Sequence, residues 1–231
     1  RWCSVGSNDD FKTVNQYRLS EAADLREVKE DGKIEASVLK EEGFSTVVKS
    51  FARSLGITRV AYFNDDKSAF SKSLAMLGNA AARHPEIRSL AKLVGNPTLA
   101  DGKALFHADH NNLASGARAM STLNDAIVKM RTQKGFGEDT SPLDIQPRFI
   151  ITGAQLAGLA KELYANKNDP TAANNNGSKF NQVAGLCESL SSSRVTSATA
   201  FYVLADPAQE PTVEVTFLRG QQSPILSVRQ Q

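Results

Sequence analysis

The feature of this sequence that most constrains its fold is a densely charged stretch at residues 21–43. Acidic and basic residues are mixed along it, and its large apolar residues are few: Leu25, Val28, Ile34, Val38 and Leu39. Asp31-Gly32 lies near its middle, and this dipeptide is a strong signal for a tight hairpin turn. Because a hairpin with so little apolar surface cannot bury a core of its own, it depends on a body formed elsewhere. The stretch predicts a long charged hairpin; a solvated surface hairpin or a disordered loop is the alternative.

The elements around this hairpin follow from apolar spacing. Residues 1–10 are polar after Trp2 and indicate an unanchored arm, whereas Asp10–Leu19 alternates as a strand does. Residues 44–63 are rich in Val, Phe, Ile, Thr and Tyr, a composition typical of strands. Two stripes at helical spacing follow: Phe70, Leu74, Leu77 and Ala81, then Ile87, Leu90, Leu93 and Val94. Pro85 lies between the stripes and predicts a kink or the start of a second helix.

The second half of the chain mixes helices and strands as well. Residues 96–116 carry few cues for either and are expected to form a loop. Amphipathic patterns predict helices over 117–130 and 154–164, with a short buried strand at Pro147–Ile151 between them. The Asn-rich residues 166–179 predict a long mobile loop, and strands are expected at 195–204, 212–218 and 224–228. Because the elements interleave without a regular βαβ rhythm, the expected fold class is α+β.

Charge and composition argue against several classes of function. The 231 residues include 27 basic and 25 acidic side chains, a net charge of +2, without the clustered cations that a nucleic-acid-binding face needs. No apolar run approaches the roughly 18 residues that would indicate a membrane span. Cys3 and Cys187 form neither a disulfide framework nor a metal knuckle, so both are expected to be free thiols in a reducing compartment.

One loop carries candidate chemistry. His107-Ala108-Asp109-His110, with Asp101 upstream, places two imidazoles and two carboxylates within ten residues, and these groups are ordinary ligands of zinc or iron. The spacing differs from the helix-borne motif in which two His residues lie four apart. The alternative is that both histidines bond loop backbone and hold an irregular connection in place. Cys187 lacks a neighbouring base and Ser189–Ser193 lacks the turn that exposes a catalytic serine, so no enzyme is supported.

Longer blocks of sequence carry a resemblance that no single motif carries. They include I-T-R-V-A-Y-F-N-D-D at residues 57–66, G-N-P-T-L-A-D-G-K-A-L-F-H-A-D-H-N-N-L at 95–113, I-Q-P-R-F-I-I at 145–151, F-Y-V-L-A-D-P at 201–207 and V-E-V-T-F-L-R-G-Q-Q-S-P at 213–224. In these blocks, which occur in order over nearly the whole chain, the sequence resembles the major capsid proteins of tailed bacteriophages. The resemblance is to the Mu-like major head subunits, which are often encoded as a fusion of a prohead protease with the capsid protein.

The resemblance implies a Hong Kong 97-type capsid fold. Its expected parts are an N-terminal arm at residues 1–20, a hairpin called the E-loop at 21–43, a peripheral domain with a long spine helix at 44–95, a mainly axial domain at 96–200, and return strands of the peripheral domain at 201–231. Relatives continue the helix at the position of Pro85 and extend beyond Pro224. A shorter or kinked spine helix and an incomplete sheet are therefore expected. A fused protease would explain a chain that begins at Arg1.

The resemblance also implies a function without catalytic residues, metal or cofactor. The chain is expected to assemble with copies of itself into hexamers and pentamers of an icosahedral shell that encloses DNA, contacting the DNA non-specifically and no membrane. Scaffold, prohead protease and portal proteins are further candidate partners. The expected location is the virion, after assembly in the bacterial host cytoplasm. Candidate contacts between subunits are the charged hairpin residues Arg26, Glu27, Lys29, Glu30, Asp31, Lys33 and Glu35.

Three alternatives stay open at this point. A metal-dependent hydrolase would use His107, Asp109 and His110 with Asp101. A bacterial nanocompartment shell would share the capsid fold but would need a terminal cargo-binding groove. A degenerate prophage remnant would fold without assembling.

Overall fold

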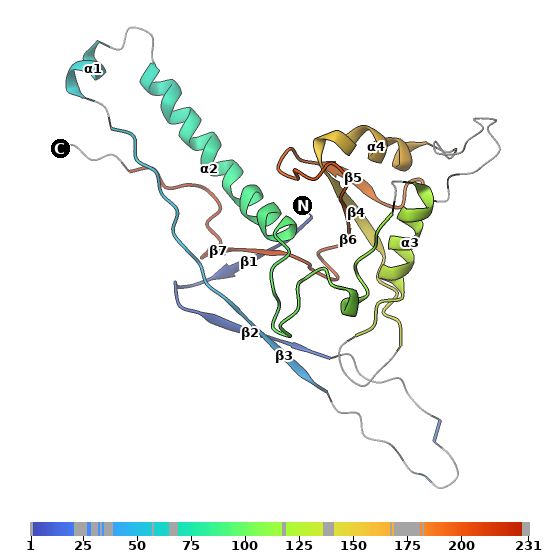
Figure 1. The fold of residues 1–231 in the computed structure, drawn as a ribbon. Coiled ribbons are helices and arrows are strands. Elements are labelled where there is room, and N and C mark those ends of the chain that lie inside the picture. The colour runs from blue at the N-terminus through green and yellow to red at the C-terminus, as the bar shows by residue number, and fades with distance from the viewer. Residues whose placement is uncertain are drawn as a thin grey trace.

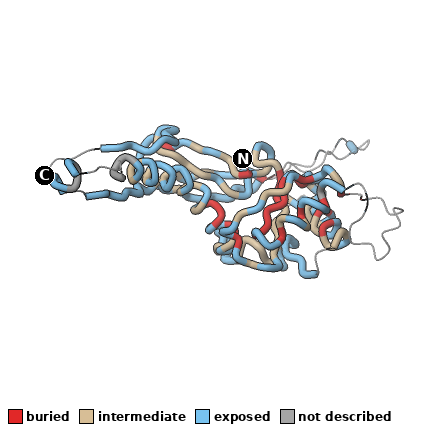
Figure 2. The backbone as a smooth tube through the Cα atoms, turned by 90° about the horizontal axis from the view of Figure 1, so that it is seen from above, coloured by how far each residue is buried: buried red, intermediate tan, exposed pale blue. Residues whose placement is uncertain are grey.

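The computed structural model describes residues 2–20, 27–28, 32, 34, 39–56, 58–64, 69–116, 119–135, 141–166, 168, 181 and 183–227. The described chain is elongated (Figures 1 and 2). A three-stranded sheet with two helices forms one end, and a long helix and a two-stranded ribbon extend away from it in different directions (Figure 1). Buried residues gather at the sheet end, and the opposite end is exposed (Figure 2). The mixture of helices and strands is that of an α+β fold.

The three-stranded sheet is built around β4 (Pro147–Thr152). β5 (Glu188–Ser191) pairs with β4 in parallel, and β6 (Phe201–Ala205) pairs with it antiparallel. The helices α3 (Met120–Arg131) and α4 (Ala157–Ala165) pack with this sheet, and a 3-10 turn at Ala154–Leu156 precedes α4. Every residue of β4 except Arg148 is buried. These elements confirm the two predicted helices and the predicted buried strand.

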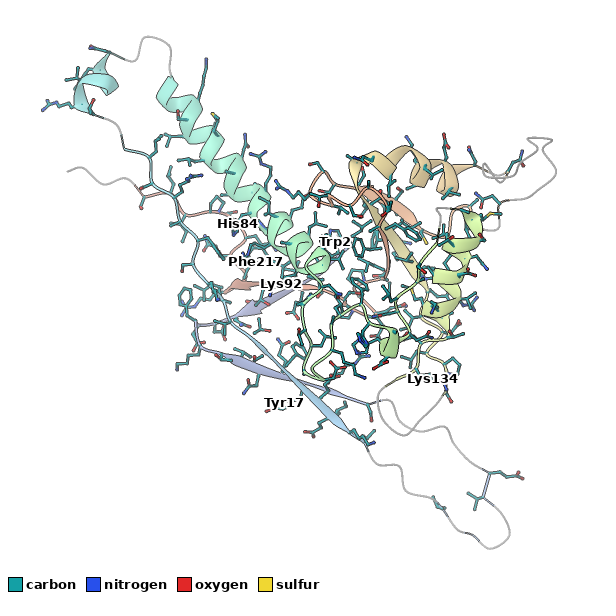
Figure 3. All side chains as sticks on the ribbon, viewed as in Figure 1. Trp2, Tyr17, His84, Lys92, Lys134 and Phe217 are labelled. Atoms are coloured by element: carbon teal, nitrogen blue, oxygen red, sulfur yellow. The ribbon has the colours of Figure 1, made fainter. Side chains whose placement is uncertain are left out.

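β4 divides the core in two because neighbouring side chains of a strand point to opposite faces. On one face, Ile150 packs with Leu123 and Ile127 of α3 and with Val183 and Cys187. On the other face, Phe149 and Ile151 belong to a second cluster, whose remaining members are Trp2, Leu90, Leu93, Val195 and Leu204. Leu90 and Leu93 lie near the end of the long helix, and Trp2 lies beside them (Figure 3). The second cluster therefore fastens the long helix and the N-terminal segment to the sheet.

The N-terminal segment is anchored, which corrects the prediction of an unanchored arm at residues 1–10. β1 (Ser4–Asn8) pairs in parallel with β7 (Glu214–Leu218), and Trp2 is buried with 9% of its surface exposed. The backbone N–H of Ser4 donates to the carbonyl of Val213 at 3.1 Å, and that of Arg219 donates to the carbonyl of Asn8 at 2.7 Å. The polar residues of this segment alternate along a strand whose partner is remote in sequence, so local composition does not reveal the pairing.

The antiparallel pair β2 (Val14–Leu19) and β3 (Glu41–Thr46) is called the ribbon here. It confirms the strand predicted at residues 10–19 for residues 14–19 only. Ser20 closes its outer end, because its N–H donates to the carbonyl of Lys40 at 2.8 Å and its hydroxyl accepts from the Lys40 N–H at 3.0 Å. The predicted charged hairpin therefore connects two antiparallel strands. Gly32 has a φ of 67°, the left-handed conformation expected of a turn glycine. Most of the hairpin, Asp31 included, lies outside the described residues.

The long helix α2 spans Ala69–Val94 without a break at Pro85. At 1.5 Å per residue its 26 residues measure about 39 Å. The expectation of a shorter spine or of a second helix starting at Pro85 is wrong. Proline removes one backbone hydrogen bond, but the residues on either side of it are good helix formers and Leu90 and Leu93 hold the far end in the core. The helix ends before Gly95-Asn96-Pro97, as predicted.

Two strand predictions are wrong, because within the described residues most of each segment has no strand to pair with. The strand-like segment 44–63 is a strand only up to Thr46, and its last residues form the short helix α1 (Arg59–Phe63). Residues 224–227, predicted as a strand, have no strand structure. In the other direction, β5 was not predicted, because its four residues Glu-Ser-Leu-Ser carry little β signal. Strand formation depends on hydrogen bonding to a neighbour, which periodicity alone does not supply.

Both cysteines lie among the described residues. Cys3 and Cys187 are free thiols, Cys3 half-buried and Cys187 buried. No helix in the described part of the chain is both long and apolar enough to cross a membrane.

The fold predicts that α2 is stabilised at one end only. Leu93→Ala should lower the free energy of unfolding by about 2–5 kcal/mol, because it leaves a cavity at a fully buried position. Met76→Ala, in the same helix but 69% exposed, should change it by less than about 0.5 kcal/mol. Urea denaturation of the unassembled subunit measures both. Equal losses for the two variants would contradict this account of the core.

Candidate functional site

The loop at residues 96–112 is organised by hydrogen bonds among its own residues. Asn96, with a φ of 45°, accepts from the N–H of Phe106 at 2.6 Å and donates to the carbonyl of Phe106 at 3.2 Å. The N–H of Leu105 donates to the carbonyl of Pro97, and that of Leu99 to the carbonyl of Lys103. Asparagine tolerates the left-handed conformation better than most residues. The loop therefore has a fixed shape although it contains only an isolated bridge, Thr98–Ala104, and one 3-10 turn, Ala108–His110.

His110 uses both ring nitrogens inside this loop. Its Nε2 lies 2.7 Å from Oδ2 of Asp101, and its Nδ1 lies 3.2 Å from the carbonyl oxygen of Leu105. Both partners are acceptors, so both nitrogens are satisfied only when each carries a hydrogen, as in the imidazolium form. A metal ligand must instead present a nitrogen lone pair. The geometry therefore favours a charged, hydrogen-bonded His110 over a metal-ligating one.

The electrostatics agree with this geometry. The hydrogen bond to Asp101 raises the pKa of His110 above its usual range, although burial acts in the opposite direction. The same hydrogen bond lowers the pKa of the Asp101 carboxyl, and a hydrogen bond from the backbone of Lys103 lowers it further. Each partner thus favours the charged form of the other.

His107 and Asp109 are occupied in the same way. Nδ1 of His107 accepts from the N–H of Asp109 at 3.2 Å, and the carboxylate of Asp109 pairs with the Lys103 ammonium at 2.5 Å. This pairing lowers the pKa of Asp109 and raises that of Lys103. Asn112 connects the two sides of the loop, since its amide donates to the carbonyl of Leu105 at 2.6 Å and accepts from the N–H of His107 at 3.0 Å.

The four sequence-predicted residues of the metal alternative are therefore together in space but bonded to loop backbone and to one another. Within the described ranges, no group of three or more His, Cys, Asp or Glu side chains is arranged to hold a metal ion. A hydrolase using this loop gains no support, and the interpretation of the histidines as residues that hold an irregular connection is the one the geometry favours.

The structure describes only part of the charged hairpin. Glu27 is described and exposed. Arg26, Lys29, Glu30, Asp31, Lys33 and Glu35 lie outside the described residues, and their role as contacts between subunits stays a prediction. The apolar side chains of the hairpin that are described lie open to solvent, with exposed fractions of 52% for Val28, 78% for Ile34 and 50% for Leu39.

A second candidate surface is the outer arm, which we define as residues 47–64 and 69–88. It comprises an extended segment, α1 and most of α2, and none of its described side chains is buried (Figure 2). It exposes several large apolar side chains: Phe51, Leu55, Val60, Phe63 and Met76. The ring of Phe51 contacts that of His84 at 4.4 Å between centroids and lies under the Arg88 guanidinium at 5.2 Å, so the extended segment lies against α2. These exposed apolar side chains make the outer arm a candidate interaction surface.

The sequence did not reveal this surface. The stripe of Leu74, Leu77 and Ala81 predicts a helix face turned to a core, but these side chains are only half-buried in the chain. Periodicity shows that a helix has an apolar face and does not show whether the partner belongs to the same chain. One signal in the sequence could have revealed the exposure of this helix face. Outside the outer arm, the first third of the chain has few apolar residues that could cover it.

The pair of His110 and Asp101 predicts a specific dependence of stability on pH. A raised pKa of His110 contributes stability fully below about pH 6.5 and loses it as the pH rises through that raised pKa. A lowered pKa of Asp101 contributes stability above about pH 4 and loses it as the pH falls through that lowered pKa. Asp101→Asn should therefore destabilise the protein most between about pH 4 and 6.5, measured as the difference in urea midpoint from wild type.

Asp109→Asn is the matched control for this experiment. Its partner Lys103 titrates well above neutrality, so its effect should not decline between pH 6.5 and 8.5. An Asp101→Asn effect that is the same at pH 5 and at pH 8.5 would contradict the assignment of the charged pair.

The sequence profile of a family described as phage capsid protein matches residues 41–231. A search of curated proteins found no match. Two solved structures are similar, each with a TM-score of 0.67 over 84% of this chain and 89% of the other. They are the capsid of bacteriophage JBD30 decorated with minor capsid protein trimers, at 16% identity, and the bacteriophage JBD30 capsid, at 15% identity.

At these identities the structural likeness establishes the fold, and it confirms the expected α+β capsid fold of the Hong Kong 97 type. The family match covers residues 41–231, which is most of the sequence and includes the outer arm, the loop at residues 96–112 and the three-stranded sheet. This chain therefore belongs to the phage capsid protein family, and it is a structural protein and not an enzyme.

Proposed function

We propose that this capsid protein is the major subunit of a tailed-phage head and assembles with copies of itself into hexamers and pentamers of an icosahedral shell. The observation that carries the proposal is the exposure of the ribbon and the outer arm, in a chain that matches the phage capsid family over residues 41–231. The ribbon and the outer arm expose apolar side chains that the chain itself does not cover. A shell built of many copies would cover them without needing a second kind of protein.

The parts of the fold take the following roles in this proposal. The sheet of β4, β5 and β6 with α3 and α4 forms the axial domain near the centre of each capsomer. The helix α2, with β1 and β7 beside it, forms the peripheral domain, and the hairpin that continues the ribbon is the E-loop. Residues 1–20 are assigned to the peripheral region and not to a free arm, because β1 is paired with β7.

Charge is divided between the hairpin and the outer arm in a way that supports contacts between copies. Residues 21–43 contain eight acidic and four basic side chains, a net charge of −4. The outer arm contains six basic side chains and one acidic side chain, a net charge of +5. Opposite charge on two projecting surfaces favours contact between neighbours and sets their register more than their affinity. The acidic hairpin of one subunit would lie across the basic outer arm of the next.

The remaining partners follow from the same role. The shell would enclose DNA and contact it without sequence preference, consistent with an almost neutral chain of net charge +2. Scaffold, prohead protease and portal proteins would act during assembly in the bacterial host cytoplasm, and the finished shell would be part of the virion.

Negative-stain microscopy together with light scattering tests the proposal directly. Purified protein should form rings, sheets or closed shells with five-fold and six-fold units at high concentration. Co-expression with candidate scaffold and protease proteins from a tailed phage is the second condition, for a subunit that needs priming. Protein that stays monomeric or dimeric under both conditions would contradict the proposal.

The division of charge predicts which substitutions stop assembly. The triple variant Glu27→Lys, Glu30→Lys, Glu35→Lys should abolish or slow particle formation by at least about tenfold at low salt, because it removes the acidic excess of the hairpin. Its circular dichroism spectrum and urea midpoint should match wild type, since neither described buried cluster contains these residues. Light scattering after dilution into assembly buffer measures the rate.

Two further variants separate contact from net charge. Adding Arg53→Glu and Arg59→Glu on the outer arm should restore part of the assembly rate of the triple variant. Lys161→Glu with Arg194→Glu, two exposed positions on the sheet end, changes the net charge by as much as the outer-arm pair and should not restore it. Particles that form normally from the triple variant would contradict the proposed role of the hairpin.

A further inference from the structure

The ribbon is held to the body without a core of its own. None of the side chains of β2 or β3 is buried. Tyr17 is 68% exposed and points away from the body (Figure 3), and Leu19 and Phe44 are 56% and 48% exposed. Apolar burial is the main force that fixes one element against another. The direction of the ribbon must therefore depend on other contacts near its base.

An ion pair provides such a contact between the ribbon and the body. Nη2 of Arg18 in β2 lies 3.0 Å from Oε2 of Glu210, at hydrogen-bonding distance, across 192 positions of sequence. Both side chains are partly exposed, Arg18 by 49% and Glu210 by 33%. Exposed ion pairs are weak and are screened by salt. The contact can therefore favour one direction of the ribbon without locking it.

Glu210 is held rigidly on the body side. It ends a turn that follows β6, and the carbonyl of Asp206 accepts from the N–H groups of both Gln209 and Glu210. The carboxylate of Asp206 also accepts from the N–H of Ala208 at 3.0 Å. The turn begins immediately after Leu204 and Ala205, which are buried. The carboxylate of Glu210 is thus presented from a fixed backbone connected to the core.

The chain leading into the ribbon has a fixed point followed by an exposed stretch. Arg219, with a φ of 49°, donates from its backbone N–H to the carbonyl of Asn8 and from Nε to the carbonyl of Asp9. Residues 10–13, between this point and β2, are all exposed. On the other strand, residues 49 and 50 are exposed and lead from the ribbon to Phe51, which lies against α2. Both connections can therefore act as pivots.

We propose that the ion pair between Arg18 and Glu210 is an electrostatic latch that sets the direction of the ribbon in the unassembled subunit, with residues 10–13 as its pivot. Breaking the pair lets the ribbon take other directions, so the latched state is a bias that salt or a competing charge removes. This inference goes beyond the proposed function, since it concerns the isolated chain and holds whether or not the ribbon later contacts a neighbour.

Spin-label distance measurements on the unassembled subunit test the latch. One label is placed on the ribbon through Asn15→Cys and one on α4 through Lys161→Cys, in a Cys3→Ala background. Cys187 is 3% exposed, and burial raises its thiol pKa to about 11, so it is not expected to react with the label. The wild-type pair should give one dominant distance at low salt.

Three variants give the decisive comparisons. Glu210→Gln should reduce the ratio of latched to unlatched distances about two- to five-fold, the range expected for an exposed ion pair. The exchange variant Arg18→Glu, Glu210→Arg should restore the dominant distance. Asp144→Asn is the control, because it removes a carboxylate that also pairs with an arginine, Arg131 at 2.6 Å, but lies away from the ribbon, and it should leave the distances unchanged. Wild type in 0.5 M salt should resemble Glu210→Gln.

The outcomes that overturn the latch are distinct from a failure of assembly. A Glu210→Gln distribution that superimposes on wild type overturns it, and so does an exchange variant that fails to restore the dominant distance. An equal change in Asp144→Asn also overturns it, since the effect would then be general electrostatics. None of these measurements requires a shell to form, so they remain valid if the proposed function is wrong.

Discussion

The packing of Leu90 and Leu93 against Phe149 and Ile151 is the interaction on which the rest of the structure depends. It joins the end of a 26-residue helix to the central strand of the sheet and adds Trp2 from the N-terminal segment. The opposite face of the same strand, through Ile150, holds α3. One six-residue strand thus supplies both halves of the core. The ribbon and the outer arm are attached to this junction and contribute little apolar burial of their own.

Stability is divided unevenly between the sheet end and the projecting parts of the chain. The buried clusters at one end stabilise the folded subunit, whereas in the proposed assembly the outer arm and ribbon would be stabilised when other copies cover them. Regions with few buried apolar contacts open locally at a small free-energy cost. The low cost suits surfaces that must fit neighbours in slightly different environments, as in hexamers and pentamers. The same property makes weak contacts such as that of Arg18 with Glu210 important for direction.

Local patterns in the sequence predicted the elements whose partners are near or whose burial is complete. The buried strand at Pro147–Ile151 and the second stripe of α2 could be identified because their apolar residues are close together. The pairing of β1 with β7 could not be, because it joins remote segments, and the single aromatic residue Trp2 was the only sign that the N-terminal segment is fixed. For the candidate site, the sequence brought His110 and Asp101 to attention, but only the geometry shows that both nitrogens of His110 are occupied. The exposure of the outer arm could not be read from spacing, which predicts an apolar face without naming its partner.

The parallel pairing of β1 with β7 also affects the order in which parts of the chain can fold during synthesis. Ser4 is paired with Glu214, so this two-stranded unit cannot form until β7 has left the ribosome. Contacts of such high sequence separation form slowly because a long loop must close first. Since the N-terminal segment also brings Trp2 to the cluster that holds α2, a nascent chain lacks the finished junction until β7 has been made.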